Sequence, residues 1–177
     1  SIPRLGCMPF TPLHLGPAIV FGYLFRRKIH WPTFIVANVL VDVEPFLVLT
    51  GILMIKGYPL HGYLHTFIAS LLAGSALGYL MFRLDRFLRS SFERLHLAEG
   101  AVGLSGFILG GVLGWSLHVL FDSPLYTDIR PLYPLQSNPF LLSTSLVEFY
   151  QSSVYAFLIA GLLLYVVHAY RESSKKY

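Results

Sequence analysis

The chain has 177 residues, of which 55% are hydrophobic and only 12% are charged, and its mean hydropathy is +0.62. This composition excludes an ordinary soluble domain and predicts an integral membrane protein. The single cysteine, Cys7, excludes an internal disulfide framework and a thiolate-rich metal site, so that any metal would be held by His, Asp and Glu. The net charge of +4 is spread over the ends of apolar stretches, without a nucleic-acid motif, so no nucleic-acid partner is expected.

We expect the domain itself to begin near Met8. Residues 1–7 lack the apolar core of a signal peptide, so we interpret them as an expression remnant or a short extension. Residues 8–177 are then expected to form a single transmembrane helical domain, and they contain no internal repeat and no low-complexity tract. Within this domain, residues 13–25 form a short apolar stretch as the first candidate span, and the cations at 26–28 end it.

The second apolar stretch, residues 31–55, is long enough to cross a hydrocarbon core of about 30 Å at about 1.5 Å per residue. It contains two carboxylates, Asp42 and Glu44. Carboxylates inside a span are costly and are functional candidates by default. Residues two apart on a regular helix point about 200° from each other. Both acids can therefore serve one site only if the helix is broken or distorted at Pro45.

A pair of histidines, His61 and His65, precedes the bulk of the third apolar stretch, residues 64–82. A spacing of four residues is about one helical turn, so both rings are expected on one face at the start of a helix, with Pro59 in its first turn. The helix dipole favours the neutral imidazole there, which is a ready metal ligand. The alternative is an interfacial pair that hydrogen-bonds water and lipid headgroups.

The rest of the chain completes a predicted all-α, polytopic membrane bundle of about five spans. Residues 83–97 carry apolar side chains at helical spacing among arginines, which predicts an amphipathic helix on the membrane surface. Residues 100–121 and 149–170 are the fourth and fifth spans, separated by a long loop. The third span is rich in Gly, Ala and Ser and the fourth in Gly, so we expect both to pack closely against other helices.

The distribution of cations predicts the orientation of the bundle. Ten of the thirteen Lys and Arg residues fall within residues 26–28, 83–94 and 171–176. These clusters share one side of a five-span arrangement, and by the positive-inside rule that side is cytoplasmic. We therefore expect a multi-pass protein of the cell (inner) membrane, with the loops around residues 56–63 and after Asp122 on the outside.

This topology places polar residues of several spans on the outer side. His14 begins the first span, and His118 and Asp122 form a second i, i+4 pair at the end of the fourth. The dipole at a helix C-terminus disfavours an anion such as Asp122, and a nearby cation would relieve this. An aspartate that only hydrogen-bonds water is the alternative interpretation.

These residues predict a divalent metal site. The candidate ligands are His14, Asp42, Glu44, His61, His65, His118 and Asp122. Imidazoles and carboxylates suit Zn²⁺ best, with Mn²⁺, Fe²⁺ or Mg²⁺ as alternatives. The candidates exceed one tetrahedral set, so one or two ions are expected, in the second case about 3.5–4 Å apart. Within the acidic pair, Asp42 is the better candidate ligand, and Glu44 could be a ligand, a group that orients a ligand or the general base. Glu44 or Asp122 would accept the proton of the attacking water.

Other polar residues are weaker candidates. His30, His96 and His168 lie at the predicted cytoplasmic ends of spans and are interpreted as interfacial residues. Arg130, near Asp128 in the outer loop, is expected to bind the anionic group of a substrate through bidentate hydrogen bonds. A solvated loop arginine is the alternative.

The order of these residues resembles that of the small bacterial and archaeal inner-membrane-bound metal-dependent hydrolases. The resemblance covers most of residues 8–139 and includes an early His, an acidic pair, a two-His motif, His-x-x-x-Asp and Arg-Pro-Leu-Tyr-Pro at 130–134. The chain differs in having Pro45 after the acidic pair, Glu44 in place of an Asp, and a two-His motif without the adjacent Arg and the following Ser. The resemblance implies a metal hydrolase. A more distant similarity to zinc-dependent phospholipase C and fungal zinc nucleases implies phosphoester chemistry.

We therefore expect a membrane-embedded metal-dependent hydrolase whose site opens at the outer leaflet, where a lipid or polyprenyl phosphoester is the natural substrate. The main alternative is a divalent-metal or proton transporter or channel, in which the same acids and histidines line a conduction path. Such a path requires polar groups at both depths, whereas most candidates lie on one side. A structural assembly protein without tightly bound metal is a further alternative, and the oligomeric state is left open.

Overall fold

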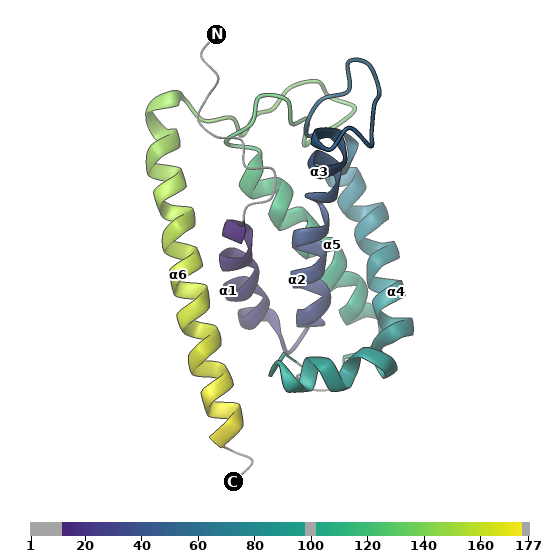
Figure 1. Cartoon of the computed structure of the whole chain (residues 1–177), viewed down its shortest axis with the longest axis vertical. Coiled ribbons are helices and arrows are strands. Elements are labelled where there is room, and N and C mark those ends of the chain that lie inside the picture. Colours follow the sequence, from purple (N-terminus) through teal and green to yellow (C-terminus); the bar gives the residue numbers. More distant parts are fainter. Residues whose placement is uncertain (1–11, 98–101, 175–177) are drawn as a thin grey trace.

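The computed structural model describes residues 12–97 and 102–174, so the expected start of the domain near Met8 lies outside the described residues. The described part is helical, with loops and turns between the helices and no strand, which confirms the all-α prediction (Figure 1). In chain order the elements are the 3-10 helix η1 (Pro12–His14), α1 (Leu15–Phe25), α2 (Trp31–Leu40), α3 (Val43–Leu49), the 3-10 helix η2 (Tyr63–His65), α4 (Phe67–Arg94), α5 (Leu104–Asp122) and α6 (Thr144–Ser174).

Four helical stretches of the described chain are long and apolar enough to cross a membrane. They are Trp31–Leu49, which comprises α2 and α3, and the helices α4, α5 and α6. The first predicted span corresponds to α1, which has only 11 residues and is shorter than these four stretches. At about 1.5 Å per residue this helix is about 16 Å long, roughly half of a hydrocarbon core. The four long helices and the short fifth confirm the predicted polytopic helical bundle.

Small residues allow the helices to approach closely. Between α4 and α5, a Cβ atom added at Gly78 would lie 2.6 Å from the Cα atom of Ile108, and one added at Gly111 would collide with the carbonyl group of Gly74. The close packing expected of the third and fourth spans is thus present. In Figure 1, α6 runs along α1 at the edge of the bundle, and a Cβ atom added at Gly161 of α6 would meet the backbone of α1.

The second span is interrupted, and the interruption lies just before Pro45 rather than at it. Pro45 has no N–H group for the carbonyl of Val41, and its ring would clash with that carbonyl in a continuous helix. Instead, the amides of Asp42 and Glu44 each donate to a carbonyl three residues back, both at 3.2 Å. This 3-10-type turn separates α2 from α3.

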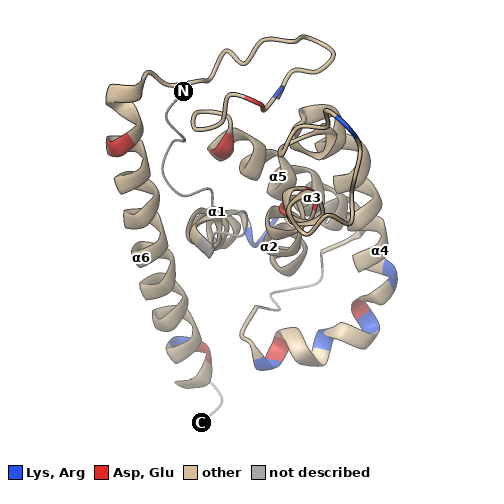
Figure 2. Ribbon diagram, turned by 45° about the horizontal axis from the view of Figure 1, so that its top comes forward, with Lys and Arg blue, Asp and Glu red and all other residues tan. Residues whose placement is uncertain are grey.

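The predicted surface helix is the C-terminal part of α4 and not a separate element. α4 has 28 residues, and its C-terminal part turns across the end of the bundle (Figure 1). Figure 2 shows basic residues on this part of α4, between α1 and α2, and near the C-terminus of α6. Of the described cations, only Lys56 and Arg130 lie elsewhere. The basic clusters therefore share one end of the bundle, and the side of the membrane that this end faces stays a prediction.

Candidate metal centre

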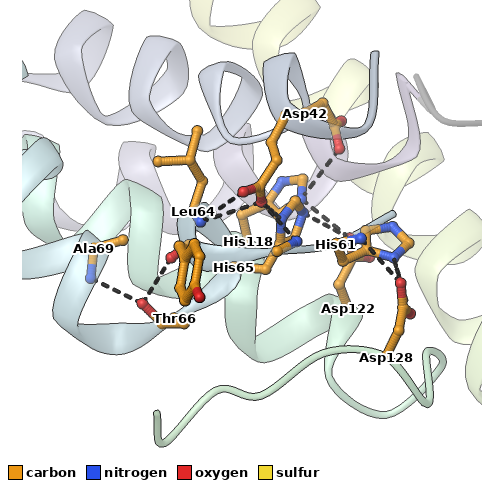
Figure 3. A network of polar contacts seen from close by, with 12 residues as sticks. Asp42, His61, Leu64, His65, Thr66, Ala69, His118, Asp122 and Asp128 are labelled. Atoms are coloured by element: carbon orange, nitrogen blue, oxygen red, sulfur yellow. Dashed lines mark hydrogen bonds and ion pairs between the residues drawn. The ribbon is translucent and has the colours of Figure 1, made fainter. Parts of the chain in front are cut away.

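Four buried residues bring potential metal ligands together at one end of the bundle. One ligand atom from each of Asp42, His65, His118 and Asp122 lies within 4.8 Å of all the others. The two histidines are fully buried, and Asp42 and Asp122 are 6% and 3% exposed. This set is termed the four-residue cluster, and Figure 3 shows its side chains converging from separate segments of the chain.

Each member of the four-residue cluster lies where a helix begins, ends or is interrupted. Asp42 is in the turn between α2 and α3, His65 ends η2 just before α4, and His118 and Asp122 are in the last turns of α5. His118 Nε2 lies 3.1 Å from Asp122 Oδ2 and 3.3 Å from Asp42 Oδ1. His65 Nε2 lies 3.9 Å from Asp122 Oδ2. Candidate ligands predicted on three different spans therefore meet.

Three imidazole nitrogens of the four-residue cluster are buried and have no hydrogen-bond partner among the described residues, namely His65 Nε2 and both ring nitrogens of His118. The two Nε2 atoms approach carboxylate oxygens without the alignment of a hydrogen bond. A buried polar atom left unsatisfied costs about 1–3 kcal/mol. A divalent cation among these atoms would satisfy both Nε2 atoms and balance two carboxylates. The residues present therefore fit a four-coordinate site with two histidines and two aspartates.

His14 contacts the four-residue cluster from the segment before α1. Its Nε2 lies 2.9 Å from Asp122 Oδ1, and its ring centroid lies 4.4 Å from that of His118. The side chain is buried. His14 is thus next to a carboxylate of the cluster, in the position of a group that orients a ligand. Its predicted role as a ligand itself stays a prediction.

Glu44 lies behind His65, outside the four-residue cluster. Its Oε2 is 2.9 Å from His65 Nδ1, the ring nitrogen that points away from the cluster. Three further groups donate to the carboxylate: the hydroxyl of Tyr58 at 2.5 Å, the amide of Gly62 at 2.9 Å and the amide of Leu64 at 3.1 Å. The carboxylate therefore holds the ring of a cluster histidine, an arrangement that is common behind metal-ligating histidines.

His61 lies beside the four-residue cluster and is oriented by Asp128. Its Nδ1 is 3.1 Å from Asp128 Oδ1, and its amide donates to Asp128 Oδ2 at 2.9 Å. Burial raises the pKa of Asp128, but the hydrogen bonds from His61 outweigh it and hold this pKa below its usual value. The ring centroids of His61 and His65 are 4.8 Å apart. His61 can thus reach the space next to the cluster.

The prediction that His61 and His65 project from one turn of an α-helix is wrong. His61 and Pro59 lie in the loop before η2, and His65 ends that 3-10 helix. α4 begins only after Thr66, whose hydroxyl accepts a hydrogen bond from the amide of Ala69 at 3.0 Å. Threonine is a preferred N-cap residue and histidine is not, which explains why the helix starts after the pair.

Two residues that orient the site were not predicted from the sequence, Tyr58 and Asp128. Both lie in loops, where no periodicity connects them to the histidines. The only signal was that each is a polar residue on the predicted outer side. Arg130 lies in the same loop as Asp128 and is exposed, and its guanidinium donates to the carbonyl of Gln136. Its predicted role in substrate binding stays a prediction.

Two of the histidines at the opposite end of the bundle are packed inside the protein, so the interpretation of them as interfacial is wrong. His30 is buried, its Nδ1 is 2.7 Å from Thr33 Oγ1, and its ring stacks on that of Phe107 at 3.8 Å. His168 is buried as well, and its Nε2 is 2.9 Å from the carbonyl oxygen of His96. Packing against aromatic rings and paired polar groups explains their burial.

Comparisons of the chain with protein-family models, with curated proteins and with solved structures found no match. The resemblance to membrane-bound metal-dependent hydrolases therefore rests on the sequence motifs alone.

Proposed function

We propose that the protein is a membrane-embedded, metal-dependent hydrolase that acts on a lipid or polyprenyl phosphoester at the outer leaflet of the cell membrane. The observation that carries the proposal is the four-residue cluster, in which two buried imidazole nitrogens without partners approach two carboxylates. This set of donors suits Zn²⁺ best, with Mn²⁺, Fe²⁺ or Mg²⁺ as alternatives. Because the described chain consists mainly of apolar helices, a substrate is expected to arrive from the membrane or its surface.

The residues around the site have distinct roles in this proposal. The four-residue cluster holds the ion, and a bound divalent cation supplies Lewis acidity and a nucleophile derived from water at neutral pH. Asp122 would be the acceptor for a proton released by water, and His14, whose Nε2 lies 2.9 Å from Asp122 Oδ1, donates to this carboxylate and orients it. Arg130 binds the anionic phosphate group through its guanidinium. A phosphoester would fit a metal ion that acts together with this arginine.

Metal analysis together with an activity assay tests the proposal. The purified protein is expected to carry one or two equivalents of a divalent transition metal that chelation removes. In detergent, the metal-loaded protein should hydrolyse a phosphoester bond of a long-chain phospholipid or of a polyprenyl phosphate. His65→Ala and Asp122→Asn should lose metal and turnover, because each removes a ligand.

A matched control variant lies at the opposite end of the bundle. His96→Asn should keep both metal and turnover, and Asn tolerates the positive φ of 52° at this position. Wild-type protein that binds no divalent metal would contradict the proposal. The same holds for metal-loaded protein that turns over none of these phosphoesters.

A divalent-metal or proton transporter is the second candidate function, and buried polar residues along α2 favour it. His30, Thr33 and Asn38 are buried and extend from the basic end of the bundle toward Asp42. Asn38 Oδ1 has no hydrogen-bond partner among the described residues. The other polar groups are paired, since His30 contacts Thr33 and the Asn38 amide donates to the carbonyl of Gly114 at 3.1 Å. Metal or proton flux in liposomes without hydrolysis would support this second function.

A further inference from the structure

The carboxylate of Glu44 is fully occupied by hydrogen-bond donors. An ionised carboxylate has about four lone-pair positions. Four groups donate to Glu44, namely the Tyr58 hydroxyl, the Gly62 and Leu64 amides, and His65 Nδ1. Only 3% of Glu44 is exposed. A general base must accept a proton from water, and this nearly buried carboxylate has no vacant lone pair for a water molecule.

We propose that Glu44 is a positioning residue that, held by Tyr58, fixes His65 in the tautomer protonated on Nδ1 and directs Nε2 into the metal site. A carboxylate only accepts hydrogen bonds, so the proton of this contact is on His65 Nδ1. The lone pair of the neutral ring is then on Nε2, the atom that lies unpartnered in the four-residue cluster. This inference rests on the proposed metal site, and among the three roles predicted for Glu44 it selects that of a group that orients a ligand, in place of general base or direct ligand.

Tyr58 connects this arrangement to the loop that carries the histidines. Its hydroxyl donates to Glu44 Oε1 at 2.5 Å and accepts the amide of Tyr63 at 3.3 Å. Burial and the hydrogen bond to Glu44 raise the pKa of Tyr58 to about 12, so the hydroxyl remains a donor at neutral pH. Because Tyr58 and the amides on Glu44 belong to the same loop, the position of this loop and the orientation of the His65 ring depend on one carboxylate.

Nitrogen NMR of the histidine side chains tests the tautomer independently of metal and activity. In the chelated full chain, His65 should be protonated on Nδ1. His168 is the internal control, because its Nε2 lies 2.9 Å from the His96 carbonyl oxygen and must donate, so this ring is protonated on Nε2. Glu44→Gln keeps the shape of the side chain and places an amide N–H group among these donors, so His65 should become a mixture of tautomers while His168 stays unchanged. Wild-type His65 protonated on Nε2 would overturn the inference.

Zinc titration measures the consequence for the metal site. Loss of a group that orients a ligand lowers metal affinity about 10–100-fold, and this loss is expected for Glu44→Gln. Tyr58→Phe removes one hydrogen bond and should weaken binding about two- to tenfold. Tyr63→Phe is the matched control, because the hydroxyl of this exposed residue makes no hydrogen bond with any described residue. Its affinity should equal that of the wild type.

Turnover at saturating zinc separates positioning from base catalysis. If Glu44 only positions His65, saturating zinc should restore most of the turnover of Glu44→Gln. If Glu44→Gln bound zinc with wild-type affinity but saturating zinc did not restore its turnover, the inference would be overturned and Glu44 would be the general base. If Glu44→Gln does not fold, equal affinities of Tyr58→Phe and Tyr63→Phe would overturn it. Wild-type protein without metal would contradict the proposed function and with it the metal role of Glu44, while the tautomer of His65 would still decide whether Glu44 orients the ring.

Discussion

Metal binding should stabilise the fold, because the ligands in the four-residue cluster come from three separate segments. Asp42 interrupts the second span, His65 precedes α4, and His118 and Asp122 end α5, with one ligand atom of each within 4.8 Å of the others. An ion bound there is lost as soon as one of these segments unpacks. At a free metal concentration of about 100 times Kd, binding to the folded state alone adds about 2.7 kcal/mol. At about 2–4 °C per kcal/mol for a chain of 177 residues, the Tm should rise by about 5–11 °C.

Thermal unfolding in detergent, with Zn²⁺ and with a chelator, measures this rise. Asp122→Asn replaces one ligand oxygen with an amide nitrogen and should lose most of the rise. Each variant is compared with its own chelated form, so that a change in the stability of the metal-free protein cancels. His96→Asn should show the full rise. If zinc raised the Tm of Asp122→Asn as much as that of the wild type, the ion would not be in the four-residue cluster. If zinc did not raise the Tm of the wild type, the metal site itself would be refuted.

Three further predictions concern packing, pH and topology. Gly78→Ala should lower the Tm, because its Cβ atom would lie 2.6 Å from the α5 backbone, whereas ordinary contacts begin near 3.4 Å. Relieving this clash would push α4 and α5 apart by about 0.8 Å. Gly103→Ala is the control and should leave the Tm unchanged, because a Cβ atom at this position meets open space. Burial and Arg89 lower the pKa of His30 from 6.5 to about 4. Between pH 6.5 and 4 the unfolded chain therefore binds a proton at His30 that the folded protein does not, so the free energy of unfolding should fall as the pH decreases through this range. His30→Phe should flatten this dependence when unfolding is measured as a function of pH. In a cysteine-free background, an impermeant thiol reagent added outside should label a cysteine at Gly57 and not one at Arg89.

The apolar stretches of the sequence were sufficient to predict four of the five expected spans, and the first, α1, is too short to cross a membrane alone. A helix that crosses a bilayer needs a long apolar run and satisfies its own backbone, so its presence depends little on distant contacts. Residues 100–121 and 149–170 accordingly correspond to α5 and α6. The surface helix was predicted as a separate element at residues 83–97, but no Gly or Pro interrupts the chain there, and α4 continues into it.

The candidate site was predictable in its residue types but not in its connections. His118 and Asp122 lie on a regular helix, so their spacing correctly predicted that they would meet. The contact between Glu44 and His65 spans 21 residues and that between His61 and Asp128 spans 67, and each includes a loop residue or a 3-10 turn. Such contacts follow from the tertiary fold and leave no periodic pattern in the sequence.

The irregular backbone beside the four-residue cluster explains why a buried acid is found in this span. A loop at the end of an apolar bundle leaves N–H and C=O groups that a continuous helix would pair, and such groups are costly away from water. Here Glu44 accepts the amides of Gly62 and Leu64, and the indole of Trp115 donates to the carbonyl of Leu64 at 2.8 Å. The carboxylate that satisfies this backbone also holds the ring of His65 at 2.9 Å. An apolar residue in its place would remove both contacts at once, so the cost of burying the acid is offset by backbone pairing and by the orientation of a candidate ligand.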